Sequence, residues 1–159
     1  MYGKILVPYD SSTASLMALE HAMKLAQVIG SHVIILHVIP EIPKSQKNPA
    51  MRPPRELQEE LALSERIRSV YNTMIDIATL ELEAKRKEYR TTGIGITIAV
   101  RVGHVVDSIV EFAKKEGVEL VVISNVGSGV TSNKGMLGSV SRSVAERASC
   151  PVLIVRHSA

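Results

Sequence analysis

Residues 4–39, KILVPYDSSTASLMALEHAMKLAQVIGSHVIILHVI, decide the fold of this chain. Ile5-Leu6-Val7 is a short apolar run, which is typical of a strand buried on both faces of a parallel sheet. Apolar residues then recur at steps of four, three and four, which predicts an amphipathic helix that ends at Gly30. These residues are Ala18, Ala22, Leu25 and Ile29. Residues 33–39 predict a second strand, and the three elements together form a β-α-β unit with parallel strands.

The rest of the chain repeats this alternation. Further buried strands are predicted at residues 96–100, 120–123 and 152–155, with helices at 105–115 and from Ser139 onwards. Five strands that alternate with helices are typical of one doubly wound α/β domain, with a five-stranded parallel sheet and helices on both faces. The chain has 159 residues, 45% of them hydrophobic, which suits a single domain over 1–159.

Residues 40–90 hold a loop and a long helix. Five of the seven prolines lie within 40–54, together with basic residues, so we expect an exposed loop there. A helix is predicted from about 55 to 90, and Thr91, Thr92 and Gly93 end it. Its apolar stripe consists of Leu63, Ile67, Val70, Met74, Ile77, Leu80 and Ala84. We expect this stripe to pack on the sheet, and the alternative is a coiled-coil partner, because the spacing also resembles heptads.

The composition argues against several classes of protein. The net charge is +3, but the basic residues are interspersed with 16 acidic ones and aromatic residues make up 3%, so no nucleic-acid partner is expected. The single cysteine, Cys150, allows no internal disulfide, and no Cys/His spacing indicates a zinc site. No apolar run approaches the roughly 18 residues of a membrane span, and no signal sequence is evident, so we expect a cytoplasmic protein without a membrane partner.

Two loops are placed to form a binding site. In open α/β sheets, ligands bind beyond the carboxyl ends of the strands, where the strand order reverses. The loops at 8–11 and 125–139 both leave predicted strands at that end. The second loop holds four glycines and leads into a helix at Gly138 and Ser139, where N–H groups and the helix dipole favour a phosphate. The alternative is a surface loop in which these two residues only cap the helix.

Common catalytic patterns do not occur. The chain has neither G-x-x-x-x-G-K-[ST] nor G-x-G-x-x-G between its first strand and helix, so a P-loop hydrolase and a dinucleotide-dependent dehydrogenase are not expected. Its five histidines show no metal-ligand spacing and no evident carboxylate for a triad, so no catalytic residue is assigned.

Several motifs together resemble the universal stress protein family. They are Lys4 to Ser12 (KILVPYDSS), Leu36-His37-Val38, Gly103 ahead of a helix, Gly138 to Ser141 (GSVS) and Cys150 to Leu153 (CPVL). The resemblance covers essentially the whole chain apart from residues 40–54. It implies the strand order 3-2-1-4-5 and a homodimer in which the strand at 152–155 pairs with that of a second copy.

The family contains members that bind ATP and members that do not, and the binders carry G-x2-G-x9-G-[ST] in this loop. Gly138 and Ser139 match the last pair of that motif. Asn125 and Ser128 occupy the positions of its first two glycines, although asparagine tolerates a positive φ and glycines lie one or two residues away. The loop residues expected at the nucleotide are Asn125, Gly127, Ser128, Gly129, Gly138, Ser139, Val140 and Ser141.

Residues outside this loop complete the expected site. Pro8, Tyr9 and Asp10 resemble the end of the first strand in ATP-binding members, where the acidic residue lies near the ribose and a phosphate-bound metal. Val38 resembles the apolar residue that contacts adenine. Asp10 is therefore a candidate ligand of Mg²⁺, through water or the nucleotide. The alternatives are that Asp10 is only the N-cap of the first helix, and that Val38 is only the last core residue of its strand.

The resemblance implies a dimeric regulatory or stress-protective module that binds ATP or AMP with Mg²⁺ and has little or no hydrolytic activity. The displaced glycines leave an alternative, a homodimeric scaffold that works without nucleotide through its dimer and the 40–54 loop, with an unidentified protein partner. An adenylating enzyme is disfavoured, because Asp10-Ser11-Ser12 lacks the preceding glycines that hold pyrophosphate.

Overall fold

The computed structural model describes residues 1–43, 53–128 and 136–157. Its sheet contains β1 (Lys4–Pro8), β2 (His32–Pro40), β3 (Ile96–Gly103), β4 (Leu120–Ser124) and β5 (Val152–Val155). The strand order is β3-β2-β1-β4-β5, and all neighbouring pairs are parallel. The predicted fold class and strand order are therefore confirmed. Gly129 and most of the 40–54 loop lie outside the described residues.

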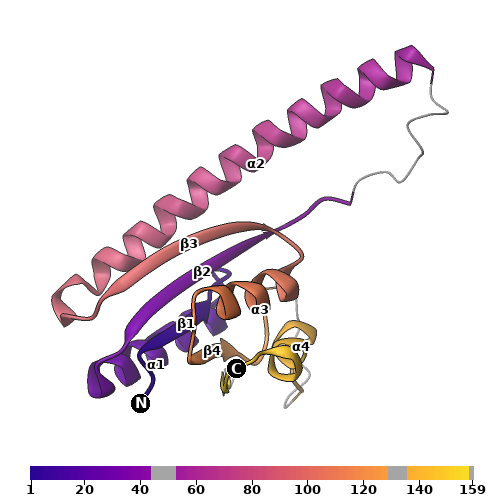
Figure 1. Ribbon diagram of the computed structural model, residues 1–159. Helices are drawn as coiled ribbons and strands as arrows, with labels where there is room; N and C mark the ends of the chain where they lie inside the picture. Colours follow the sequence, from indigo (N-terminus) through magenta and orange to yellow (C-terminus); the bar gives the residue numbers. More distant parts are fainter. Residues whose placement is uncertain (44–52, 129–135, 158–159) are drawn as a thin grey trace.

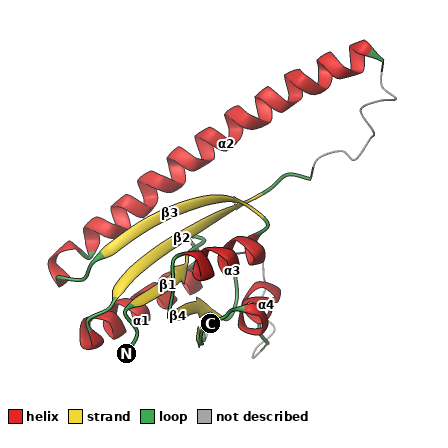
Figure 2. Cartoon of the chain, in the orientation of Figure 1, coloured by secondary structure: helices red, strands yellow, loops and turns green. Residues whose placement is uncertain are grey.

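Helices cover both faces of the sheet (Figures 1 and 2). Helices α1 (Thr13–Ile29) and α2 (Pro54–Glu88) lie on one face, and α3 (Val105–Lys115) and α4 (Ser139–Arg147) lie on the other. A 3₁₀ turn, η2 (Arg90–Thr92), leads from α2 towards β3. Ile5 and Val7 pack in the core beneath α1, whereas Leu6 packs in the core beneath α3. Burial on both faces explains why the strands are continuously apolar.

The ends of α1 show which residue caps the helix. The side chain of Ser12 accepts a hydrogen bond from the Ser15 N–H at 3.1 Å, and the helix closes at Gly30, which has a φ of 74°. The alternative that Asp10 is the N-cap of this helix is therefore wrong. A serine adjacent to the helix performs that role, which leaves the carboxylate of Asp10 for other contacts.

Helix α2 departs from the prediction. The side chains of its predicted apolar stripe are largely exposed: Leu63 55%, Val70 50%, Met74 41%, Ile77 61% and Leu80 72%. The prediction that this stripe packs on the sheet is wrong, because a different row, with Ala78 and Leu82 buried, faces the sheet. The C-terminal half of the helix runs along β3, and the N-terminal half extends beyond the sheet (Figure 1). Within the described ranges, no helix is long and apolar enough to cross a membrane.

Candidate functional site

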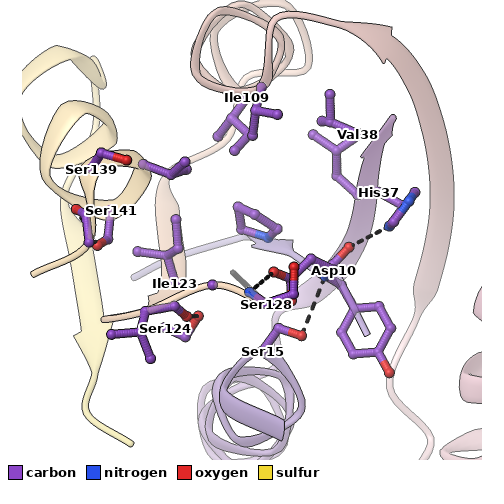
Figure 3. Close-up of a pocket in the computed structure, with 18 of the residues that line it drawn as sticks. Asp10, Ser15, His37, Val38, Ile109, Ile123, Ser124, Ser128, Ser139 and Ser141 are labelled. Atoms are coloured by element: carbon purple, nitrogen blue, oxygen red, sulfur yellow. Dashed lines mark hydrogen bonds between the residues drawn. The ribbon is translucent and has the colours of Figure 1, made fainter. Parts of the chain in front are cut away.

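A cavity of about 360 Å³ lies beyond the carboxyl ends of β1 and β4, where the strand order reverses (Figure 3). Its walls come from the loop after β1, the end of β2, α3, the loop after β4 and the start of α4. Both loops singled out in the sequence therefore contribute to one cavity. Its volume falls within the range of about 300–1,000 Å³ that is usual for small-molecule sites.

Asp10 joins the two loops. Its Oδ2 accepts a hydrogen bond from the Ser128 N–H at 2.9 Å, and its Oδ1 accepts one from the Ser12 N–H at 3.1 Å. Burial alone would raise the pKa of Asp10, but hydrogen bonds from Ser12, Ser128 and Ser15 hold it below its ordinary value. The carboxylate is therefore ionised at neutral pH and brings a negative charge to the cavity. Its oxygens retain lone pairs for a further ligand.

The loop after β1 has an uncommon backbone conformation. Ser11 has a φ of 67°, in the left-handed region that residues other than glycine seldom adopt. Tyr9, which is 5% exposed, anchors the loop: its N–H donates to the Leu36 carbonyl, and its own carbonyl lies 2.8 Å from Nδ1 of His37. The half-buried His37 ring also lines the cavity, and it donates this hydrogen bond when the proton is on Nδ1. These contacts fix the direction in which Asp10 leaves the strand.

Asn125 supports the loop after β4 and is not one of the cavity-lining residues. It is 6% exposed, and its Oδ1 accepts a hydrogen bond from the His157 N–H at 2.8 Å. Its main-chain oxygen accepts hydrogen bonds from the Gly138 N–H at 2.7 Å and the Ser141 hydroxyl at 3.0 Å. Ser11 is the one non-glycine residue with a positive φ in the described part of the chain, so Asn125 does not use its tolerance for that conformation. Its predicted contact with a nucleotide stays a prediction.

Gly127 and Ser128 line the mouth of the cavity, and both are exposed. A Cβ atom on Gly127 would lie 3.2 Å from Oδ2 of Asp10, closer than most side-chain contacts. The glycine therefore allows the carboxylate to approach this loop. Gly129 lies outside the described residues, so its predicted role stays a prediction.

Helix α4 presents its N-terminus to the cavity. It begins after Gly138 without a side-chain cap, and Gly138, Ser139, Val140 and Ser141 all line the cavity. A Cβ on Gly138 would lie 3.3 Å from the Asn125 carbonyl oxygen, so a glycine suits the close approach of this helix to the loop. The Ser141 hydroxyl is buried and donates towards the same oxygen. An uncapped helix N-terminus at a cavity wall is suited to bind an anion.

Another part of the cavity wall is apolar. Val38, at the end of β2, lies near Ile109 of α3 (Figure 3). The remaining apolar lining residues are Pro8, Leu36, Pro40, Val105, Ile123, Val126 and Val140. Sequence reasoning identified Val38 but missed Ile109 and Val105. The helical spacing of α3 predicts that it has a buried face, but not that this face reaches the end of β2.

The cavity carries little formal charge. Asp10 is the one carboxylate among the described lining residues, and these include no lysine or arginine. The described residues also contain no group of three or more His, Cys, Asp or Glu side chains able to hold a metal ion. Mg²⁺ commonly binds to one or two carboxylates together with water and substrate phosphates. Asp10 fits that partial role, provided that the ligand brings phosphate oxygens of its own.

Sequence comparison relates the whole chain to one family. The family model described as the universal stress protein family matches residues 1–156. The chain is 29% identical to universal stress protein MJ0577 of Methanocaldococcus jannaschii, over 99% of this chain and 96% of that relative. It is 31% identical to universal stress protein YxiE of Bacillus subtilis, over 98% of this chain and 100% of that relative.

Comparison with solved structures agrees with this result. The structure of MJ0577 superposes with a TM-score of 0.81 at 28% identity, and the match covers 100% of this chain and 99% of that chain. A universal stress protein solved in complex with cAMP superposes with a TM-score of 0.61 at 25% identity, over 97% of this chain and 96% of that chain.

Proposed function

This chain belongs to the universal stress protein family, and from that premise we propose that its cavity binds an adenine nucleotide, ATP or AMP, as part of a regulatory or stress-protective role. The observation that carries the proposal is the pairing of an apolar wall with an uncapped helix N-terminus in one cavity. The apolar wall suits a flat adenine base, and the helix N-terminus suits a phosphate. The similar protein solved with cAMP supports an adenine nucleotide as the ligand class.

Val38 and Ile109 would contact the adenine, because both contribute apolar side chains to the same end of the cavity (Figure 3). The first turn of α4, at Ser139 and Val140, would contact a phosphate through main-chain N–H groups. Gly127 lets the Asp10 carboxylate lie against the loop after β4, and both residues line the wall along which a phosphate chain would lie.

The proposal includes Mg²⁺ with the triphosphate. Asp10 is anionic and, in the described part of the chain, no cationic side chain lines the cavity, so ATP would meet a carboxylate without a protein cation to balance its own charge. Mg²⁺ placed between the phosphates and Asp10 would remove that repulsion. Since Asp10 is also held by two N–H groups, it is a poor general base, and we propose little or no hydrolysis.

Calorimetric titration of the purified protein with ATP, with and without Mg²⁺, tests the proposal. We expect saturable binding that Mg²⁺ strengthens. Ser139→Glu should weaken ATP binding at least tenfold, or about 1.4 kcal/mol, because it adds a negative charge at the phosphate end. The exposed Ser139 side chain tolerates this change, and a carboxylate at a helix N-terminus stabilises the helix.

Ser149→Glu is the matched control, since it adds the same charge at an exposed position beyond the other end of α4. It should bind ATP like the parent. Equal binding by the parent and Ser139→Glu would contradict the assignment of the phosphate end. Heat no larger than dilution in the parent would contradict nucleotide binding as a whole.

A second candidate function is a scaffold that works without nucleotide. The loop positions that bear glycine in ATP-binding members favour it, because Asn125 and Ser128 are both engaged within the protein. The Asn125 side chain binds the His157 N–H, and the Ser128 N–H binds Asp10. Under this alternative, neither ATP nor AMP would produce heat on titration or raise the melting temperature.

We also propose that the open edge of β5 pairs with β5 of a second copy. β5 is the last strand in the sheet order, hydrogen-bonded to β4 alone among the described strands. Leu153 is 42% exposed on it. An edge strand with exposed apolar residues is a template for pairing with another chain. Leu153→Lys should lower the mass of the assembly in solution, and an unchanged mass would contradict this pairing.

A further inference from the structure

Helix α2 exposes a continuous apolar stripe. Leu63, Val70, Met74 and Ile77 are 55%, 50%, 41% and 61% exposed, and the half-buried Ile67 lies between them in sequence. Their steps of four, three, four and three place them on one side of the helix over about 21 Å. The row that contacts the sheet, with Ala78 and Leu82, is offset from this stripe by roughly a quarter turn. The stripe is therefore not a part of the core of its own chain.

The N-terminal half of α2 has little support from the residues of its own chain that the structure describes. Ala78 and Leu82 are the buried residues of the helix, and both belong to its C-terminal half. Towards Pro54 the helix extends past the end of the sheet (Figure 1). An isolated helical stretch of this length is marginal in water, and most helical stability in proteins comes from packing of an apolar face. A partner that covers the stripe would supply that packing.

We propose that a second copy of this chain covers the stripe, with the two α2 helices packed antiparallel about a two-fold axis. The axis would pass near the middle of the stripe, so that Ile67 lies opposite Ile77 of the second copy. Val70 would lie opposite Met74 in the same way. The contact is isologous, because the same apolar face is used by both copies.

The charges at the two ends of α2 favour the antiparallel orientation. Near the N-terminus, residues 54–60 carry three glutamates and one arginine, for a net charge of −2, and Arg55 pairs with Glu59. Residues 82–88 carry three basic and two acidic residues, for a net charge of +1, and Lys85 and Arg86 pair with Glu88 and Glu83. Antiparallel packing places each acidic end beside a basic end, whereas parallel packing places like charges together. Charges that flank an apolar seam commonly set the orientation of paired helices.

The position of the sheet leads to the same orientation. The sheet packs against the C-terminal half of α2, and the N-terminal half lies free of it (Figure 1). In an antiparallel pair, the two sheets lie at opposite ends of the helix pair. Each unsupported N-terminal half then packs beside the supported half of the other copy. This interface lies on the β3 side of the sheet and is separate from the edge of β5.

The first test measures the mass of the full chain by analytical ultracentrifugation. The double variant Val70→Glu/Ile77→Glu should lower the mass of the parent: to that of the monomer if α2 forms the sole interface, and to that of the β5-paired dimer if both interfaces form. Both side chains are at least half exposed, so the folded chain tolerates the change. Asn72→Glu is the control, since Asn72 is exposed, lies two residues after Val70 and so on the opposite side of the helix from the stripe, and should leave the mass unchanged. The inference is overturned if the double variant keeps the parental mass.

The second test determines the orientation with single cysteines in a Cys150→Ser background. Thr73→Cys lies near the proposed two-fold axis, so a short bifunctional thiol reagent should cross-link it to its counterpart. Leu63→Cys lies about 27 Å along the axis from its counterpart in an antiparallel pair, and it should not cross-link. Cross-linking at both positions would show parallel helices, and cross-linking at neither would show that α2 is not the interface. Either result would overturn the inference.

Discussion

Asp10→Asn should destabilise the protein by a predictable amount, because it removes the charge that joins the loops after β1 and β4. The carboxylate accepts hydrogen bonds from the N–H groups of Ser128 at 2.9 Å and Ser12 at 3.1 Å. A hydrogen bond to a charged group contributes about 1.5–3 kcal/mol, against about 0.5–1.5 kcal/mol for a neutral pair. Asparagine keeps one oxygen and turns an NH₂ group towards the other N–H. We expect the free energy of unfolding to fall by about 2 kcal/mol at neutral pH.

The size of this loss should depend on pH. The pKa of Asp10 is lower in the folded protein than its ordinary value of 3.8, because its hydrogen bonds outweigh the effect of burial. A carboxyl group with a lowered folded pKa stabilises the folded state above its unfolded pKa, and that contribution is lost as the pH falls through the folded value. The difference in stability between parent and variant should therefore be constant at neutral pH and shrink below pH 3.8.

Urea unfolding measured from neutral to acidic pH checks both expectations. Asp76→Asn is the control, because Asp76 is exposed on α2 and its replacement should change the stability little at any pH. Two results would refute the reasoning. One is an Asp10→Asn variant as stable as the parent at neutral pH, and the other is a deficit that stays the same across the acidic range.

Two further substitutions test the core and the apolar end of the cavity. Leu82→Ala should lower the free energy of unfolding by about 2–5 kcal/mol in urea, because Leu82 is 1% exposed, whereas Leu80→Ala, at a 72% exposed position, should cost less than about 0.5 kcal/mol. Equal effects would place the wrong face of α2 against the sheet. Val38→Ala should weaken ATP binding about tenfold by calorimetry, since two methylene-sized groups are lost from the base contact. Val28→Ala, 84% exposed on α1, should bind ATP like the parent, and an unweakened Val38→Ala would remove Val38 from the site.

The β-α-β unit was predictable from the sequence because each pattern in it is typical of one kind of element. An apolar run between breakers indicates a buried strand, and Gly30 ends α1 with the left-handed conformation that glycine favours. Helix α2 was not predictable in the same way, because it carries two apolar rows. Helical periodicity is satisfied by the row through Val70 and Ile77 and by the row through Ala78 and Leu82. Which of the two rows packs on the sheet depends on tertiary contacts, and the helical period of the sequence does not determine these contacts.

Site residues at the end of a strand were predictable from the sequence. Site residues whose role depends on contacts between distant segments were less predictable. Asp10 and Val38 follow strands, so the topology brings them to one edge of the sheet. Ile109 enters the cavity because α3 crosses above β2. The hydrogen bond from the His157 N–H to the Asn125 side chain joins residues that are 32 positions apart in the sequence. It explains how Asn125, at a position where ATP-binding members carry glycine, supports the loop after β4. No local sequence pattern reports such a contact.

The position of Asp10 connects the stability of the sheet centre to the proposed ligand. β1 and β4 are neighbours, and the carboxylate of Asp10 joins the loops that leave them. A cation held between this carboxylate and a phosphate chain would draw on lone pairs that the two N–H groups leave unused. Binding of ATP with Mg²⁺ would then strengthen the contact that Asp10 already makes between the loops after β1 and β4. AMP has a shorter phosphate chain and would contact the start of α4 without necessarily engaging Asp10. The proposed function therefore predicts that the triphosphate, more than the monophosphate, couples occupancy of the cavity to the rigidity of the sheet centre.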